Sequence, residues 1–385
     1  MSPASLEEER RDRLVLSLIF EPGDPRVADL VERFGAPRAL ELIRANLLAA
    51  EVVTDAAQRL TALRPDTVLD VGAQIGARYV IPGDEEWPAP LEDLVHAGQL
   101  SGRGGVPLGL WVRGQRLDRL VPRVAIVGSR SATTYGVEQA ALIAAECTHA
   151  GHVVVSGGAF GIDIAAHRAT LAAGGSTIVA LAHGLDRVYP VAHAPIVEAA
   201  LATGAMVSEL APGTAPMQLR FLARNRLIAG LAAGTVIVEA GVRSGALNTA
   251  NWTSRLSRPL MAVPGPTTSS ASRGTHELIR SGAAVLTATG PEVVELLTGP
   301  GEVTVAPLRA PTRRRDRLDT RSRQLLEAVP LARPADVSRI ATVAGIGLLD
   351  AQRMIRRLEE QRLVVFEAGG WRLASPDEPA EDLPP

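Results

Sequence analysis

Apolar residues recur with the period of an amphipathic helix over the first part of the chain. One set runs from Leu14 to Ile19, and two more follow at 27–34 and 40–47. Pro25 and Pro37 stand near the starts of the second and third sets, where a missing backbone N–H is harmless. The pattern predicts a small helical module at residues 1–75.

From Val121 onward the pattern changes to short apolar runs that alternate with amphipathic stretches. The runs predict strands at 124–127, 152–155, 177–181, 205–208, 236–239 and 259–263, after two strand-like runs at 78–81 and 108–113. Continuous apolar strands that alternate with helices are typical of a parallel sheet covered on both faces. Residues 76–298 therefore predict an α/β core with a doubly wound, mostly parallel sheet.

The remaining residues divide into three segments. Residues 299–322 are rich in Gly and Pro and then in Arg, which indicates a linker. Residues 323–374 predict three helices and a hairpin that turns at Ala368 and Gly369, the pattern of a winged-helix domain. The acidic, Pro-rich tail at 375–385 predicts disorder.

Composition removes several kinds of chemistry. All 40 residues counted as Lys or Arg are Arg, so the chain has neither a P-loop lysine nor a lysine nucleophile. The single cysteine, Cys147, excludes an internal disulfide, a Cys-rich zinc site and an iron–sulfur cluster. We predict no cofactor and no metal.

Charge and hydropathy limit the partners. The net charge of −2 predicts no general affinity for polyanions, so a nucleic-acid site must be a local patch. No apolar run reaches the length of about 20 residues that a membrane helix needs, and the N-terminus lacks a signal core. We expect a cytoplasmic protein without membrane contact.

Candidate chemistry lies in three loops that follow predicted strands. They contain Gly128, Ser129 and Arg130; then Ser156, Gly157, Gly158, Phe160 and Gly161; and finally Arg243, Ser244 and Gly245. Glycines let backbone N–H groups approach an anion, and the next helix adds positive potential. Ligands of doubly wound sheets bind at this edge. The loops predict a phosphate site, although each glycine alone could serve only a tight turn.

A second concentration of charge surrounds Arg224, Asn225 and Arg226. Positions 220–258 hold one acid, Glu239, and six arginines, at 220, 224, 226, 243, 255 and 258. A solvated helix face would explain the charge, but Asn225 is poorly suited to a helix interior and favours a site.

Catalysis has little support. Asp163 and His167 lie four positions apart on one helix, as an acid–base pair or two metal ligands would. An Asp that offsets the helix dipole beside a packed His explains the same spacing. His183 and His193 have the same structural interpretation. We predict no catalytic residue.

In order along the chain, several motifs resemble the bacterial DNA-processing protein A (DprA/Smf) family. They are Val-Ala-Ile-Val-Gly-Ser-Arg at 124–130, Ser-Gly-Gly-Ala-Phe-Gly-Ile-Asp at 156–163, Arg-Asn-Arg-Leu-Ile-Ala-Gly-Leu at 224–231, Glu-Ala at 239–240 and Val-Pro-Gly at 263–265. The resemblance covers roughly residues 78–297. The helical module and the winged helix fit the same architecture.

The resemblance implies an extended Rossmann-like core with a SAM-like N-terminal module. It implies a non-enzymatic homodimer that binds single-stranded DNA, protects incoming strands during natural transformation and helps to load the RecA recombinase. Arg130, the turn from Ser156 to Gly161, and Arg224 to Arg226 resemble the family's DNA pocket. Phe160 stands where a basic residue is usual, so it either stacks on a base or packs in the protein.

Two alternatives remain open. A phosphoribohydrolase of the lysine-decarboxylase-like type would share the core and the loops, but its signature PGG-x-GT-x-x-E is absent. In the winged helix, Arg353, Arg356 and Arg357 could contact duplex DNA or a protein partner.

Overall fold

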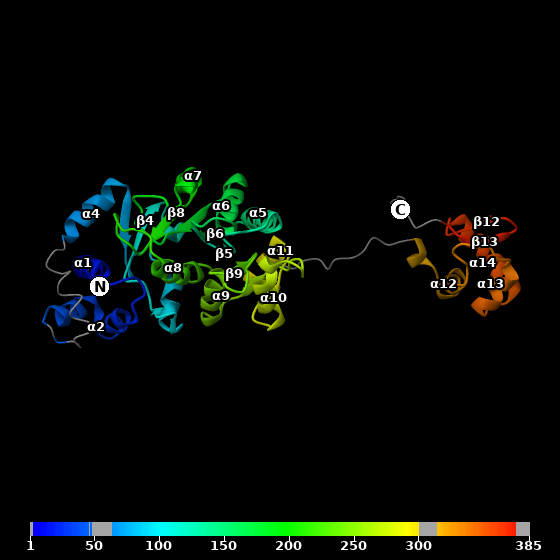
Figure 1. Ribbon diagram of the computed structural model, residues 1–385, viewed down its shortest axis with the longest axis horizontal. Coiled ribbons are helices and arrows are strands. Elements are labelled where there is room, and N and C mark those ends of the chain that lie inside the picture. Colours follow the sequence, from blue (N-terminus) through cyan, green and yellow to red (C-terminus); the bar gives the residue numbers. More distant parts are fainter. Residues whose placement is uncertain (1–2, 46, 48–63, 300–313, 375–385) are drawn as a thin grey trace. The chain divides into compact units, whose positions relative to one another are not determined.

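The structure is a computed structural model that describes residues 3–45, 47, 64–299 and 314–374. It contains two compact units, Met1–Val305 and Ala306–Pro385 (Figure 1). Residues 300–313 of the linker predicted at 299–322 lie outside the described residues, as does the predicted disordered tail at 375–385. In the described parts of the chain, no helix is long and apolar enough to cross a membrane.

The N-terminal helices of the larger unit are α1 (Pro3–Ile19), α2 (Pro25–Arg44) and α4 (Pro65–Gln74). Asp24 caps α2 by accepting a hydrogen bond from the Arg26 backbone N–H. Gly35, with φ of 75°, has non-helical backbone and divides α2 into two helical segments just before Pro37, which match the predicted second and third helices. Leu16, Ile19, Val27, Leu40 and Ile43 form the core that α1 shares with α2.

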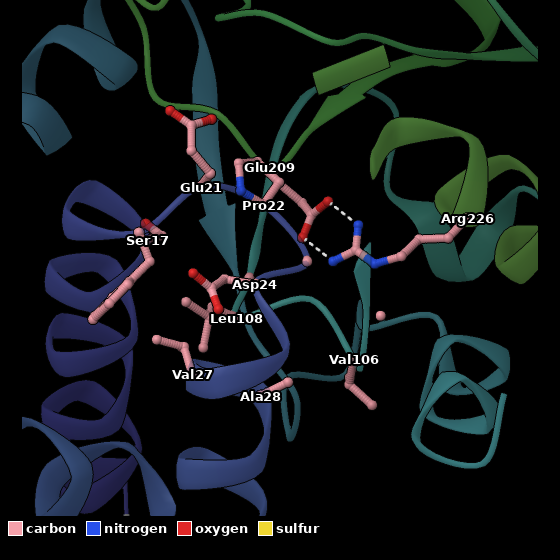
Figure 2. Close-up of a pocket in the computed structure, with 14 residues that line it drawn as sticks. Ser17, Glu21, Pro22, Asp24, Val27, Ala28, Val106, Leu108, Glu209 and Arg226 are labelled. Carbon is pink, nitrogen blue, oxygen red and sulfur yellow. Dashed lines mark hydrogen bonds and ion pairs between the residues drawn. The ribbon is translucent and has the colours of Figure 1, made fainter. Parts of the chain in front are cut away.

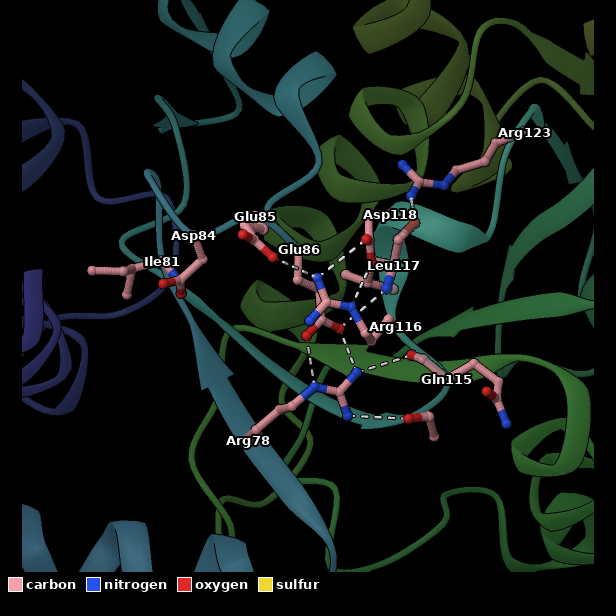
Figure 3. Close-up of polar contacts among 11 residues, drawn as sticks. Arg78, Ile81, Asp84, Glu85, Glu86, Gln115, Arg116, Leu117, Asp118 and Arg123 are labelled. Atoms are coloured by element: carbon pink, nitrogen blue, oxygen red, sulfur yellow. Dashed lines mark hydrogen bonds and ion pairs between the residues drawn. The ribbon is translucent and has the colours of Figure 1, made fainter. Parts of the chain in front are cut away.

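A connecting segment leads from these helices to the core. It contains β1 (Ala77–Val80), the 3₁₀ turn η1 (Ala89–Val95), β2 (Gln99–Leu100), β3 (Arg103–Gly104), β4 (Leu110–Gly114) and the turn η2 (Leu117–Arg119). Arg78 ties its two ends together, because its guanidinium binds the Glu86 carboxylate and the carbonyls of Gly114 and Gln115 (Figure 3). The charges of Arg78 and Glu86 are therefore both paired, which indicates a structural network.

Nine strands form one sheet in the order β1-β4-β8-β7-β6-β5-β9-β10-β11. The parallel strands are β5 (Arg123–Val127), β6 (Val153–Gly157), β7 (Thr177–Ala180), β8 (Ala205–Ser208), β9 (Thr235–Ile237), β10 (Leu260–Ala262) and β11 (Val285–Leu286). Antiparallel β4 and β1 extend the β8 side. The predicted α/β fold with a mostly parallel sheet is confirmed; the two-residue strand β11 was not predicted.

Helices cover both faces of this sheet (Figure 1). One layer contains α5 (Thr134–His149), α6 (Ile162–Ala172), α7 (Ala194–Thr203) and α11 (Gly290–Leu297). The other contains α8 (Gln218–Leu231) and α9 (Ala246–Arg255), and α10 (Arg273–Arg280) follows β10. Alternate residues of β5 divide between the layers: Val124 and Ile126 pack with α5, and Ala125 and Val127 pack with α8.

The C-terminal unit contains η5 (Arg314–Arg317), α12 (Thr320–Glu327), α13 (Val337–Ala344), α14 (Leu348–Glu360) and the hairpin of β12 (Val364–Glu367) and β13 (Gly370–Leu373). Asp319 caps α12, which therefore begins ahead of residue 323. The three helices and the hairpin occur in the predicted order. The winged-helix identification and the domain boundaries at 75 and 298 remain predictions.

Candidate functional site

An open cleft of about 990 Å³ lies at the carboxyl ends of the parallel strands. Its walls come from the loops after β5 and β9, the first half of α8 and the start of α10. Arg130, Arg224, Arg243 and Arg273 line it, one from each of these four elements. The strand-end position is the one predicted from the loops.

The loop after β5 holds Arg130 out toward solvent. Gly128 leaves no room for a side chain, because a Cβ there would lie 2.5 Å from Ile162 Cγ1. The Ser129 N–H donates to the Glu239 carbonyl at 2.7 Å, and the Ser131 N–H donates to Ser129 Oγ. This rigid turn places the Arg130 guanidinium 4.9 Å from the ring centre of Phe221, a cation–π contact.

The loop after β6 is mostly scaffold. Ser156 is fully buried and donates its hydroxyl proton to the Ile126 carbonyl at 2.6 Å. Gly157 is buried, and a Cβ there would lie 1.6 Å from Arg224 Nη1. Gly161, with φ of 78°, passes so close to Ser129 that a Cβ would lie 2.1 Å from its carbonyl oxygen. These residues make room for the cleft and do not line it.

Three members of that loop face a smaller apolar pocket beside the cleft. Gly158, Ala159 and Phe160 line it together with Tyr189 and Phe221. The Phe160 ring is 51% exposed and meets His193 edge-on at 4.5 Å between ring centres. Of the two predictions for Phe160, stacking and packing, the exposed ring leaves a face available for stacking.

The loop after β9 lies in the cleft from Gly241 to Gly245. Arg243, Ser244 and Gly245 all line the wall, and Ser244 Oγ accepts a hydrogen bond from the Ala246 N–H at the start of α9. Arg243 is exposed, and the described part of the chain supplies no carboxylate partner for it. Its charge is free to meet an anion.

Arg224 and Asn225 of α8 also line the cleft, but both are largely buried. Arg224 Nη1 donates to the Ala180 carbonyl at 2.9 Å, while its Nε has no partner among the described residues. Burial lowers the pKa of this guanidinium. Asn225 Nδ2 donates to Asn248 Oδ1 at 3.2 Å, so this amide joins α8 to α9.

Arg226, which was predicted to contact the ligand, does not line the cleft. Its side chain is fully buried and points toward Glu209 (Figure 2). Arg226 Nη2 donates to Glu209 Oε1 at 2.6 Å, and the second guanidinium N–H group binds the other carboxylate oxygen. Three further arginines of the predicted cluster are also structural: Arg220 pairs with Glu21, and Arg255 and Arg258 bind backbone carbonyls.

Arg273, the first residue of α10, was not predicted. It is exposed, lines the cleft and has no carboxylate partner among the described residues. The available signal was its position after β10, another parallel strand whose carboxyl end meets this edge.

Asp163 is the single acid among the described residues that line the cleft. It is 5% exposed, and burial raises its pKa while the nearby Arg224 opposes that rise. His167 is fully buried between Thr177 Oγ1 at 2.6 Å and the Gly157 carbonyl at 2.9 Å, and burial lowers its pKa to about 4. The structural interpretation of this pair fits the geometry.

The remaining histidines of the region are also held by backbone. His183 and His193 are buried, and their Nδ1 atoms lie 2.9 Å from the carbonyls of Gly184 and Gly158. No group of three or more His, Cys, Asp or Glu side chains in the described residues is arranged to hold a metal ion. The cleft therefore combines exposed arginines with little competing negative charge, which suits a phosphate-bearing ligand.

Comparison with known proteins agrees with this chemistry. Residues 78–298 match the family model of DNA recombination-mediator protein A. The chain belongs to this family. A family relative from Mycobacterium tuberculosis, a putative DNA processing protein DprA, is 39% identical over 364 residues, which cover 93% of this chain and 92% of the relative.

Two comparisons with one organism support the same family. The DNA processing protein DprA of Streptococcus pneumoniae is 39% identical over 205 residues, 53% of this chain and 69% of the relative. Its X-ray structure aligns with a TM-score of 0.60 and 30% identity, over 76% of this chain and 97% of that one. The resemblance to the DNA recombination-mediator family and the predicted fold class are both confirmed.

Proposed function

We propose that this protein is a recombination mediator that binds single-stranded DNA in the cleft described above. The observation that carries the proposal is the convergence of Arg130, Arg224, Arg243 and Arg273 from four elements onto one open cleft that has a single acid, Asp163. Phosphates are the natural ligands of such a surface, because guanidinium groups form charge-assisted hydrogen bonds with their oxygens.

The apolar side chains beside these arginines favour a single strand over a duplex. Phe160 and Tyr189 are 51% and 49% exposed, and Phe221 already carries the Arg130 guanidinium. Unpaired bases have free faces that stack on such rings, whereas duplex bases do not. With few aromatic residues available, we expect binding to be mainly electrostatic and therefore sensitive to salt.

The nucleotide-enzyme alternative is less well supported. Glu-Ala-Gly at 239–241 has only a distant likeness to the phosphoribohydrolase signature, and its acid, Glu239, is 1% exposed. Both of its carboxylate oxygens are occupied, one by the Thr133 hydroxyl and the other by the Thr133 N–H, each at 2.8 Å. This carboxylate organises the cleft wall and is not free to act on a substrate. We therefore propose a non-catalytic protein.

Further parts of the proposal rest on the family alone. We propose that the protein acts as a homodimer in the cytoplasm, protects incoming strands in natural transformation or recombination, and helps to load RecA. In the C-terminal unit, Arg353 pairs with Asp350, while Arg356 and Arg357 are exposed. We assign that unit to contact with duplex DNA or with a protein partner, and a binding assay on each would separate the two.

The test is fluorescence anisotropy with a labelled oligo-dT and the corresponding duplex over a salt series. We expect preference for the single strand, a steep loss of affinity with salt, and weaker binding by Arg130→Ala. Arg280→Ala is the matched control, since Arg280 is 77% exposed and pairs only with Glu277 of its own helix. Binding that Arg130→Ala leaves unchanged would remove the cleft as the site, and no binding would revive the nucleotide-enzyme alternative.

A further inference from the structure

Helix α8 belongs to two environments. Phe221, Arg224 and Asn225 face the cleft. Arg220 and Arg226 of the same helix do not line the cleft and instead bind groups on its other side. Any change in the position of α8 would therefore alter the contacts in the cleft and those on the other side of the helix.

The first anchor is an ion pair between α8 and Glu21, which lies in the loop between α1 and α2. Arg220 Nε lies 2.8 Å from Glu21 Oε2, and Nη2 lies 2.7 Å from Glu21 Oε1, so the guanidinium and the carboxylate form a two-point contact. The Arg220 and Glu21 side chains are 13% and 29% exposed. Two hydrogen bonds fix the orientation as well as the distance of the two groups.

The second anchor surrounds Arg226 (Figure 2). Arg226 Nε donates to the Gly105 carbonyl at 3.2 Å, beside the pair with Glu209. The loop after α1 closes over the guanidinium, since a Cβ on Gly23 would lie 3.2 Å from Arg226 Cζ. The Gly23 carbonyl in turn accepts the Gly104 N–H at 2.9 Å. The remaining cavity of about 20 Å³ holds no more than a water, so this place is a joint and not a ligand site.

The start of α8 lacks a side-chain cap, although Arg220 Nη1 also donates to the Ala215 carbonyl just before the helix. Met217, its N-cap residue, offers no side-chain hydrogen bond to the first turn. Arg220 lies in that turn, directly before Phe221, whose ring carries Arg130, and one turn before Arg224. Movement of the first turn would displace the cleft side chains of Phe221 and Arg224 together, and with them the Arg130 guanidinium that contacts Phe221.

We propose that the N-terminal helices set the geometry of the DNA cleft through α8, with Glu21 as a positioning residue that never touches DNA. The proposal rests on the proposed function, because its first test measures binding of single-stranded DNA. It assigns a role to the module that the cleft residues alone do not suggest. The coupling passes through a contact between residues 199 positions apart in the sequence.

Glu21→Gln separates positioning from simple electrostatics. The substitution removes a negative charge, so long-range attraction alone would tighten binding to DNA. Loss of the anchor predicts the reverse, a drop in oligo-dT affinity of about three- to tenfold. The salt slope should stay at the wild-type value, because no phosphate contact is lost. Glu277→Gln, which breaks the exposed pair with Arg280, is the matched control and should not weaken binding.

The charge swap Glu21→Arg with Arg220→Glu should recover affinity relative to either single variant. Hydrogen exchange of α8 without DNA gives an independent readout, and Glu21→Gln should speed exchange in its first turns. This second readout reports on the anchor even if the wild-type protein fails to bind oligo-dT, so failure of the proposed function is recognised separately.

Three results would overturn the proposal. One is unchanged or tighter binding by Glu21→Gln, whatever its exchange rates. Another is unchanged exchange in α8. The third is a lower salt slope in Arg220→Ala while Glu21→Gln binds normally, which would make Arg220 a direct phosphate contact.

Discussion

Arg226 and Arg243 belong to the same arginine-rich stretch, yet the cleft and the joint behind α8 use arginine in opposite ways. In the cleft, Arg130, Arg243 and Arg273 are exposed and have no carboxylate partner among the described residues. In the joint, Arg226 is buried and paired with Glu209. A buried charge needs a fixed partner to offset its lost hydration, whereas an exposed one keeps its water until a ligand replaces it. Partner geometry, and not local density of charge, decides which arginines are accessible to an anionic ligand.

The largest effect is expected when one partner of the buried Arg226–Glu209 pair is removed. Glu209→Ala leaves Arg226 buried without its counter-charge and should lower the free energy of unfolding by about 3–5 kcal/mol. Arg243→Ala, on the cleft side, should leave that free energy nearly unchanged. Urea denaturation of the two variants measures both. Equal stability of the two would contradict the division between joint and cleft.

A pH experiment tests the buried His167 side chain, which contacts the Gly157 carbonyl at the end of β6. The pKa of His167 is lowered by burial to about 4, below its ordinary value of 6.5, so the folded state binds its proton less readily than the unfolded state. This contribution to stability is present above pH 6.5 and is lost as the pH falls toward 4. We expect a loss of about 2 kcal/mol between about pH 7 and about pH 5.

Urea denaturation across that range, compared with His167→Gln, isolates the contribution of this residue. The variant should show a shallower pH dependence even where it is less stable overall. Parallel curves for the two proteins would mean that His167 is not held neutral in the folded state.

The aromatic side of the cleft gives a smaller effect. Phe160→Ala should weaken oligo-dT binding by about 1 kcal/mol, at the low end of the stacking range, because His193 already occupies one edge of the ring. The salt slope should not change, and Phe160→Leu should retain only part of the affinity. If Phe160→Ala binds normally but unfolds more easily, the ring serves packing and not stacking.

The smallest effect should come from single cleft arginines. Arg273→Ala should reduce the salt slope of oligo-dT binding by about 0.7, the value for one phosphate contact on a single strand. Anisotropy titrations at four or more salt concentrations measure the slope. Arg280→Ala, a few residues further along the same helix, should leave it unchanged; a loss in both variants would point to general charge attraction.

Much of the core architecture could be predicted from local pattern. The buried strands from β5 to β10 are continuous apolar runs, which leave one interpretation once helices alternate with them. Strand β11 was not predicted, because it has only two residues, Val285 and Leu286, and both are about half exposed at the edge of the sheet. A strand that short carries no periodicity to detect.

The sequence by itself determined the α/β fold class, the family and the edge of the sheet at which ligands bind, because glycines and arginines after apolar strands signal that edge directly. Only the tertiary structure decided which of those residues are accessible. Arg226 meets Glu209, and Arg220 meets Glu21, through contacts between separate elements. Arg273 reaches the cleft because β10 is parallel to β9. Such pairings depend on how elements pack, and residue spacing along one element carries no information about them.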